Sequence, residues 1–413
     1  MKIINKIAVV AFIFLMGAST YAQEYNIEFL HGTKWKKVLK MSKKQHKPIF
    51  VDAYTTWCGP CKTLARDVFT QKKVADFFNE NFINVKMDME KGEGIKLKTD
   101  WEIKAYPTLL YFNSAGEVVH RVVGAYGADE FLVYSKMAMD ENKMALNLQK
   151  RFDAGERDGA FMYDYLVSLR LGYLKELEVQ VSNDYLQSLS NEELLKKENW
   201  NIIRDFMSDP SLQQFQYLVT NKDKLAEVVG ADEVNAKLYK TISKQIETWT
   251  YWYGKTPFET EKENSLLKFL QESSYEKAPE LLGKLLANKY KRLEDKEQYL
   301  ATLDYIVKFN LAGDSGTIVR YANNVIGTYT SESAWAKALT WLNIAEGKEN
   351  KIEHMADILT AKSNVLAKLG NKTEAELAEL AAKKADKQAE EAGTKIYTVP
   401  MMKMTGQTPK KGK

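Results

Sequence analysis

Cysteine and histidine are both scarce in this chain of 413 residues, which contains two cysteines and four histidines. A structural zinc site normally takes four such ligands, and the histidines are scattered at His31, His46, His120 and His354. We therefore expect no metal site within one chain, although zinc shared between two chains stays open. One disulfide between two cysteines would stabilise little of a chain this long, so the fold has to be stabilised by apolar packing in its core.

A strong excess of one charge is lacking as well. The sequence has 59 lysines and arginines against 55 aspartates and glutamates, which gives a formal net charge of +4. Loss of Lys2 and Lys6 with a cleaved leader makes this excess smaller still. Such a balance does not indicate nucleic acid as a partner. No motif for a cofactor stands out, so none is expected.

The first 22 residues have the pattern of an export signal. Lys2 and Lys6 precede an apolar run from Ile7 to Met16, and small residues then lead to a cleavage site after Ala22. That run is shorter than the roughly 20 residues that cross a bilayer, although an uncleaved anchor stays open. We expect residues 1–22 to be removed and the mature protein to be periplasmic or secreted.

Both cysteines lie in one hexapeptide, Trp57–Lys62, with the sequence Trp-Cys-Gly-Pro-Cys-Lys. An apolar run ends shortly before it and a helical pattern follows, which places Cys58 at a helix start. There the backbone N–H groups and the helix dipole stabilise a thiolate near neutral pH. Covalent haem attachment would need histidine in place of Lys62, and a structural disulfide would close almost no loop. The spacing therefore favours dithiol redox chemistry.

Helical and strand patterns alternate through residues 23–145. Helical spacing predicts a first helix near Trp35 with Thr33 as its N-cap, and further helices over residues 58–69, 74–78 and 128–139. Apolar or alternating runs predict strands over residues 49–54, 82–89, 108–112 and 117–123, the last two joined by a turn. This order indicates an α/β fold with a mixed sheet flanked by helices.

This domain resembles thioredoxin, and specifically the periplasmic thioredoxin-type modules of transmembrane disulfide reductases. The resemblance covers the first third of the chain. It depends on five segments with the order and spacing of that family, which are Val51-Asp52, Trp57–Lys62, Val85–Asp88, Tyr106–Thr108 and Val123-Gly124. It implies a thioredoxin fold with a redox-active disulfide between Cys58 and Cys61.

The resemblance also implies catalytic roles for four residues. Cys58 would be the attacking thiol, exposed at the helix start, and Cys61 the more buried thiol that resolves the mixed disulfide. Asp52 matches a buried carboxylate with a raised pKa that moves a proton at the resolving thiol, and Lys86 matches a lysine close to it. From the residues alone, an exposed edge position for Asp52 and a solvated face for Lys86 stay open.

Substrate contacts are implied around the same site. Pro107 matches a proline in a cis peptide, in a loop that pairs with the substrate backbone, although an ordinary trans turn stays open. Tyr106 stands where the family mostly has an aliphatic residue, which puts the substrate preference in doubt. A role in packing alone, without contact to a substrate, stays open for Trp57. The implied substrate-binding residues are Trp57, Gly59, Pro60, Tyr106, Pro107, Thr108 and Gly124.

Helical spacing continues through residues 146–392 without strand patterns. A capping box at Ser190 and Glu193 marks one helix start, and residues 356–385 resemble a tetratricopeptide-type helical hairpin. We expect an all-α, tetratricopeptide-like helical-repeat region that binds a client or a protein partner. A role as a scaffold or dimerisation element is the open alternative. The aromatic run at residues 249–253 is expected to pack between helices rather than to bind a ligand.

The last residues, 393–413, have five lysines and no acidic residue. Such a composition predicts a disordered basic tail, although its methionines leave soft-metal binding open.

These features together predict an exported thioredoxin-like protein-disulfide oxidoreductase. Cys58 and Cys61 would reduce or exchange disulfides in extracytoplasmic client proteins, since Gly59-Pro60 is the dipeptide of reducing family members. A membrane thiol reductant would then reduce the pair again. The alternative is an adaptor or chaperone in which the helical region binds partners and the redox centre is secondary. A disulfide isomerase is a third hypothesis, and it requires a dimer with facing thiols.

Overall fold

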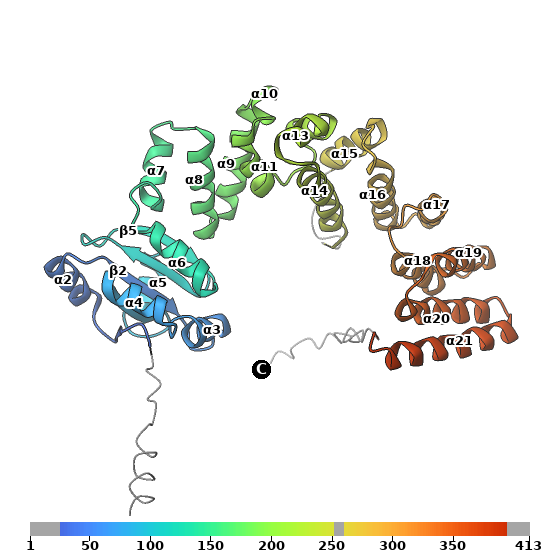
Figure 1. Ribbon diagram of the computed structural model, residues 1–413, viewed down its shortest axis with the longest axis horizontal. Coiled ribbons are helices and arrows are strands. Elements are labelled where there is room, and N and C mark those ends of the chain that lie inside the picture. The colour runs from blue at the N-terminus through green and yellow to red at the C-terminus, as the bar shows by residue number, and fades with distance from the viewer. Residues whose placement is uncertain (1–24, 252–259, 395–413) are drawn as a thin grey trace, which may run out of the picture. The chain divides into compact units, whose positions relative to one another are not determined.

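The computed structural model describes residues 25–251 and 260–394 (Figure 1). The chain divides into two compact units, the first ending at Met207 and the second beginning at Ser208. The expected signal peptide at residues 1–22 and the expected tail from Lys395 onward lie outside the described residues. Among the helices that are described, none is both long enough and apolar enough to cross a membrane.

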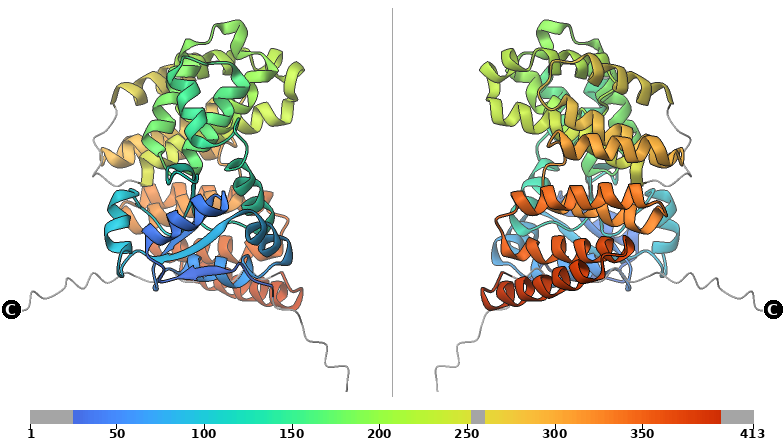
Figure 2. Two further views of the ribbon diagram at one scale, coloured as in Figure 1. Left: turned by 90° about the vertical axis from the view of Figure 1, so that its left-hand side faces the viewer. Right: turned by 90° about the vertical axis from the view of Figure 1, so that its right-hand side faces the viewer.

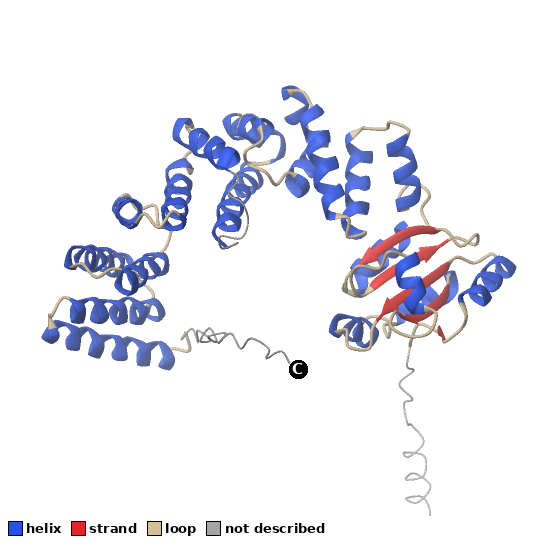
Figure 3. Ribbon diagram, turned by 180° about the vertical axis from the view of Figure 1, so that it is seen from behind, coloured by secondary structure: helices blue, strands red, loops and turns tan. Residues whose placement is uncertain are grey.

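A five-stranded mixed sheet forms the centre of the first unit (Figure 3). Its strands follow the order β1-β3-β2-β4-β5, in which β1, β3 and β2 are parallel, whereas β4 and β5 are antiparallel to their neighbours. This confirms the predicted mixed sheet. The strands are β1 (Phe29–His31), β2 (Ile49–Tyr54), β3 (Ile83–Asp88), β4 (Thr108–Phe112) and β5 (Val118–Val123).

Helices cover both faces of this sheet because its central strand is apolar on both sides. Side chains alternate along β2, so Val51 joins one hydrophobic cluster and Phe50 the other. The Val51 face is covered by α2 (Trp35–Gln45) and α5 (Gly94–Asp100), and the Phe50 face by α3 (Gly59–Asp67), α4 (Lys72–Asn81) and α6 (Ala128–Met137). Asp52 follows the same alternation as Phe50 and therefore lies on the face of α3, the helix that begins beside Cys58.

The structure corrects the predicted start of α2. Its N-cap is Lys34, whose side chain makes no capping hydrogen bond, so Thr33 as N-cap was wrong. The free backbone N–H of Trp35 instead donates to Oε2 of Glu93 at 2.7 Å. A carboxylate 58 positions away therefore satisfies this helix end, which no local motif could predict.

The first unit continues beyond the predicted α/β domain, because two further helices pack against the edge strand β5 (Figure 1). Leu171 at the end of α8 joins the same hydrophobic cluster as Phe50. The capping box of Ser190 and Glu193 is confirmed and begins the short helix α10. The helices of this extension are α7 (Ala145–Asp153), α8 (Gly159–Leu171), α9 (Lys175–Ser188), α10 (Asn191–Leu194) and α11 (Lys197–Phe206).

His120 on β5 attaches this extension to the sheet. Its side chain is buried, and its Nδ1 accepts the backbone N–H of Ala145, the first residue of α7, at 3.2 Å. Because Nδ1 accepts, the proton of the neutral ring lies on Nε2, which has no hydrogen-bond partner among the described residues. Burial lowers the pKa of His120 to about 4, so the ring stays neutral at physiological pH.

We predict a pH-dependent loss of stability through His120. The unfolded chain takes up a proton near pH 6.5, whereas the folded protein does so only near pH 4, so stability is full above pH 6.5 and falls below it. The lowered pKa of His120 corresponds to a loss of about 3 kcal/mol in the free energy of unfolding at low pH. His120→Gln keeps a hydrogen-bond acceptor but does not titrate.

Urea titrations at several pH values measure this effect as a difference between two proteins, in which other titrating groups cancel. We expect the free energy of unfolding of the wild type, relative to His120→Gln, to fall by about 3 kcal/mol between pH 7.5 and pH 4. A difference that does not change with pH would contradict the neutral, buried ring.

The described part of the second unit is entirely helical (Figure 2). Its largest core side chain is Trp341, which is fully buried and donates from Nε1 to Oδ1 of Asp304 at 2.9 Å. The helices are α12 (Gln213–Thr220), α13 (Lys222–Val229), α14 (Ala231–Tyr251), α15 (Thr260–Glu272), α16 (Ala278–Arg292), α17 (Lys296–Lys308), α18 (Ser315–Thr328), α19 (Glu332–Lys348), α20 (Ile352–Lys368) and α21 (Lys372–Glu391).

The predicted helical hairpin at the end of the array is confirmed as α20 and α21, which lie side by side (Figure 2). Its turn contains Gly370 with a positive φ, and buried alanines such as Ala378 and Ala382 let the helices approach closely. Its likeness to a tetratricopeptide repeat stays a prediction. The predicted aromatic cluster at residues 249–253 lies partly outside the described residues.

Candidate active site

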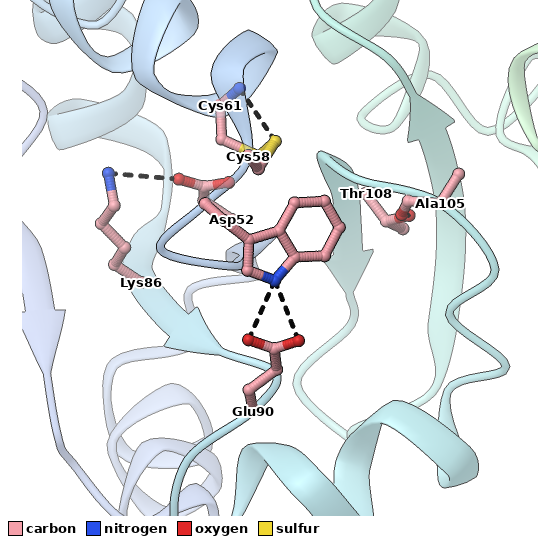
Figure 4. The surroundings of a disulfide bond; sticks show 8 residues. Asp52, Cys58, Cys61, Lys86, Glu90, Ala105 and Thr108 are labelled. Atoms are coloured by element: carbon pink, nitrogen blue, oxygen red, sulfur yellow. Dashed lines mark hydrogen bonds and ion pairs between the residues drawn. A yellow bond between two sulfur atoms is a disulfide. The ribbon is translucent and has the colours of Figure 1, made fainter. Parts of the chain in front are cut away.

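The two cysteines lie at the start of α3, directly after the loop that follows β2 (Figure 4). Cys58 is the N-cap of α3 and forms a disulfide with Cys61, with an S–S distance of 2.03 Å. Its Sγ accepts the backbone N–H of Cys61 at 3.1 Å, and the first turn carries no acidic side chain. When the disulfide is reduced, this N–H and the helix dipole favour a thiolate at Cys58.

Exposure of the cysteines differs from the expectation. Cys58 is 3% exposed and Cys61 is 4% exposed, so the prediction that Cys58 is the more exposed of the two was wrong for the disulfide form. The reason is local, because the Cys58 sulfur turns back onto the helix N-terminus to reach both the Cys61 sulfur and the Cys61 N–H. The exposed part of the site is instead the adjacent Trp57, with 66% of its surface accessible.

A buried carboxylate projects toward this helix from β2. Asp52 is 1% exposed, which excludes the exposed edge position that the sequence left open. Lys86 stands opposite it in the β2–β3 register, with its Nζ 3.4 Å from Oδ2 of Asp52. Burial raises the pKa of Asp52 to about 6, although Lys86 opposes this rise. Asp52 can therefore take up or release a proton near neutral pH.

Lys86 is held between aromatic rings. Its side chain is 18% exposed, and Nζ lies 5.1, 5.5 and 5.7 Å from the ring centroids of Tyr54, Phe29 and Phe69. Such contacts attract a cation through the negative faces of the rings. The solvated face that stayed open for Lys86 is therefore excluded, and the lysine is fixed beside Asp52.

The loop before β4 carries the expected cis peptide, between Tyr106 and Pro107. Gly124 fastens this loop, since its backbone N–H donates to the Pro107 carbonyl at 2.9 Å. Gly124 has φ +114°, a conformation that favours glycine. Thr108 is 1% exposed and donates from Oγ1 to the Ala105 carbonyl at 2.7 Å, so its side chain braces the loop from inside.

The hydrogen-bond partner of Trp57 could not be read from the sequence. The indole Nε1 donates to both carboxylate oxygens of Glu90, at 3.0 and 3.1 Å, and Figure 4 shows this contact below the disulfide. The ring lies nearly perpendicular to that of Tyr106, with the two centroids 6.0 Å apart. These contacts fix the ring, but its exposure means that packing alone does not explain it. Gly59 and Pro60, at the start of α3, are also exposed.

Comparison with known proteins agrees with this geometry. The model of the thioredoxin-like domain family matches residues 35–137. A thioredoxin-like protein of Synechocystis sp. is 35% identical over 86 residues, which are 21% of this chain and 76% of that protein. This chain belongs to the thioredoxin-like family. The residues that the family model matches lie in the first unit.

Two further relatives show how far the similarity extends. Chloroplastic thioredoxin Y of Oryza sativa subsp. japonica is 32% identical over 104 residues, and the match covers 25% of this chain and 58% of that relative. A solution structure of a proposed disulphide-isomerase from Bacteroides thetaiotaomicron has 49% sequence identity and a TM-score of 0.27, and covers 29% of this chain and 98% of that one. The two matches cover 25% and 29% of this chain.

Proposed function

We propose that this protein is a thiol–disulfide oxidoreductase that reduces or exchanges disulfides in client proteins through Cys58 and Cys61. The observation that carries the proposal is the position of Cys58 as N-cap of α3, with its sulfur accepting the Cys61 N–H. A sulfur placed there gains stability as an anion, and the thiolate is the species that attacks disulfides.

The exchange proceeds in two steps. The Cys58 thiolate attacks one sulfur of a client disulfide, forms a mixed disulfide and releases the other client sulfur as a thiolate. Cys61 then loses its proton, attacks the Cys58 sulfur and releases the second client thiolate. The client gains two electrons, and Cys58 and Cys61 lose them as they form their disulfide.

Asp52 supplies the base for the second step. A thiol with an ordinary ionisation is mostly protonated at neutral pH, so Cys61 needs a group to remove its proton. Asp52 projects toward α3 and titrates near pH 6, which suits proton transfer at neutral pH. Lys86 is a positioning residue that keeps this carboxylate partly ionised.

Export is part of the proposal and has its own test. The leader pattern at residues 1–22 supports action outside the cytoplasm, where a membrane thiol reductant would have to regenerate the dithiol. Mass spectrometry of the protein from the envelope fraction is expected to find Gln23 as the first residue. An intact Met1 in a cytoplasmic fraction would contradict export.

Trapping of partners tests the proposed reaction. In Cys61→Ser the mixed disulfide at Cys58 cannot be resolved, so we expect client proteins bound covalently and released by dithiothreitol. The variant that lacks both cysteines is the matched control and should retain none of them. Equal retention by both variants would contradict disulfide exchange and favour the adaptor hypothesis.

A cavity in the second unit is the observation that favours the adaptor hypothesis. It has a volume of about 660 Å³ and lies between α18, α19 and α20. Its walls carry charges of both signs, including Arg320, Lys348, Asp314 and Asp357, which suits a polar segment of a protein partner. The double-cysteine variant in the trapping experiment separates partners held here from clients held at Cys58.

A further inference from the structure

The corner between α8 and α9 lies against the loop that carries the cis peptide. A small hollow of about 10 Å³ is lined on one side by Ala105, Thr108 and Val123 of the thioredoxin-like domain, and on the other by the corner residues Tyr173 and Leu174. The corner is fixed there because α8 packs on β5 and Leu171 belongs to the core of the domain. The helical extension therefore adds residues beside the active site.

Tyr173 has a backbone conformation that tyrosine disfavours. Its φ is +60°, whereas the preceding Gly172 has φ −73°, so the glycine stands one position before the residue that needs it. The helix end is otherwise regular, with the Leu174 N–H donating to the Leu169 carbonyl at 3.0 Å. A glycine in place of Tyr173 would have no steric penalty there.

Burial of the Tyr173 side chain does not compensate for the free-energy cost of its positive φ. Tyr173 is 58% exposed, and Leu174 beside it is 37% exposed. Among the described residues five that are not glycine have a positive φ, and two of them, Glu102 and Tyr173, line this one hollow. Backbone strain of this kind gathers at functional sites, where it positions a side chain for use.

The rings of Trp57 and Tyr173 are exposed, whereas the ring of Tyr106 is half-buried and its hydroxyl is buried. Trp57 precedes Cys58, and its ring is nearly perpendicular to that of Tyr106. Ala105 is the neighbour of Tyr106 in the loop, and it lines the hollow together with Tyr173 and Leu174. A peptide whose sulfur meets Cys58 would pass over these side chains. The charged residues at the hollow are Glu102, Lys104 and Arg121, and the Arg121 guanidinium is engaged by the carbonyls of Trp101 and Glu102.

We propose that Trp57, Tyr106, Tyr173 and Leu174 form one docking surface for an extended client segment with a large apolar or aromatic side chain next to its disulfide cysteine. The inference rests on the proposed function, which supplies the occupant. Aromatic side chains on such a surface contribute strongly to binding because they bury large areas at little cost in conformational entropy. The extension would thus set the client preference of the redox site.

Two synthetic peptide disulfides test this surface, one with phenylalanine and one with serine beside the cysteine. We expect the reduced wild-type protein to react about tenfold faster with the phenylalanine peptide, and Tyr173→Gly to lose most of this preference. Because glycine relieves the strained φ, the variant is expected to melt no lower than the wild type. Glu294→Gly is the matched control, since Glu294 has φ +55° at the end of α16, and it should keep the wild-type preference.

Three results would count against the inference. Equal rates of the wild type with both peptides, or an unchanged preference in Tyr173→Gly, would overturn the docking surface. A melting temperature of Tyr173→Gly several degrees below that of the wild type would show that the ring serves stability instead. Reaction with 5,5′-dithiobis(2-nitrobenzoic acid), a small disulfide without a peptide chain, tests the redox centre separately. If the wild type fails to reduce it, the proposed function fails, and the inference with it.

Discussion

Cys58→Ser is expected to abolish disulfide reduction, with the rate of insulin reduction by dithiothreitol falling to that without protein. A serine hydroxyl does not ionise near neutral pH and cannot form a mixed disulfide, so no partial reaction survives. The expected loss is at least about 10³-fold, because the thiolate is the nucleophile of the first step. Turbidity of the precipitating insulin chains measures the rate directly.

The fold itself should tolerate this change. The Cys58–Cys61 disulfide spans three positions of the chain and constrains little of the unfolded state, so its loss costs little stability. A serine also keeps an N-cap oxygen at the start of α3. A melting temperature close to that of the reduced wild type is therefore the control. Reduction of insulin by Cys58→Ser at the wild-type rate would contradict the proposed function.

Asp52→Asn is expected to slow turnover about 100-fold at pH 7, because it removes the base that serves Cys61. Asparagine has the shape of the carboxylate but takes up no proton. The wild-type rate should rise with pH through a midpoint near 6, where Asp52 loses its proton, and this midpoint should be absent in the variant. Single-turnover measurements with a peptide disulfide between pH 5 and pH 8 show both effects.

The same substitution should stabilise the protein. The pKa of Asp52 is raised from 3.8 to about 6 on folding, so the folded protein binds the proton more tightly and loses stability as the pH rises through this range. The raised pKa of Asp52 corresponds to a loss of about 3 kcal/mol in the free energy of unfolding at pH 8. Urea titration should find Asp52→Asn more stable than the wild type by up to this amount at pH 8, with no gain from this source below pH 4. A destabilised variant at pH 8 would mean that Asp52 holds the fold together instead.

Much of the first unit could be predicted because its central strands are short, apolar and bounded by polar segments. The bounds of β2 and β4 agree with the predicted ranges to the residue. Strand β1 has only three residues and helix α5 only seven, too few for a periodic pattern, and neither was predicted. Gly94 at the start of α5 packs so closely on the backbone of Asp88 that any side chain would clash, a contact invisible in the sequence.

Some residues of the candidate site were also predicted from the sequence, and others were not. Cys58 and Cys61 were predicted from their spacing. The pairing of Asp52 with Lys86 was predicted from the family resemblance, and the structure places Nζ of Lys86 3.4 Å from Oδ2 of Asp52. Glu90 and Tyr173 could not be predicted, because Glu90 accepts from Trp57 and Tyr173 lines a hollow with Ala105, and both pairs are far apart in the sequence. A local pattern identifies a helix start, but it does not identify a carboxylate 33 positions away that orients an indole ring.

The central claim is that the Cys58 sulfur, placed at the N-terminus of α3, is a thiolate near neutral pH. Alkylation of the reduced protein by iodoacetamide tests it, with mass spectrometry to identify the labelled cysteine and the rate followed between pH 4 and pH 10. We expect selective labelling of Cys58, with a midpoint near pH 7. A midpoint near pH 8.5, the value of an unperturbed thiol, or no labelling of Cys58 in the native protein would contradict the account.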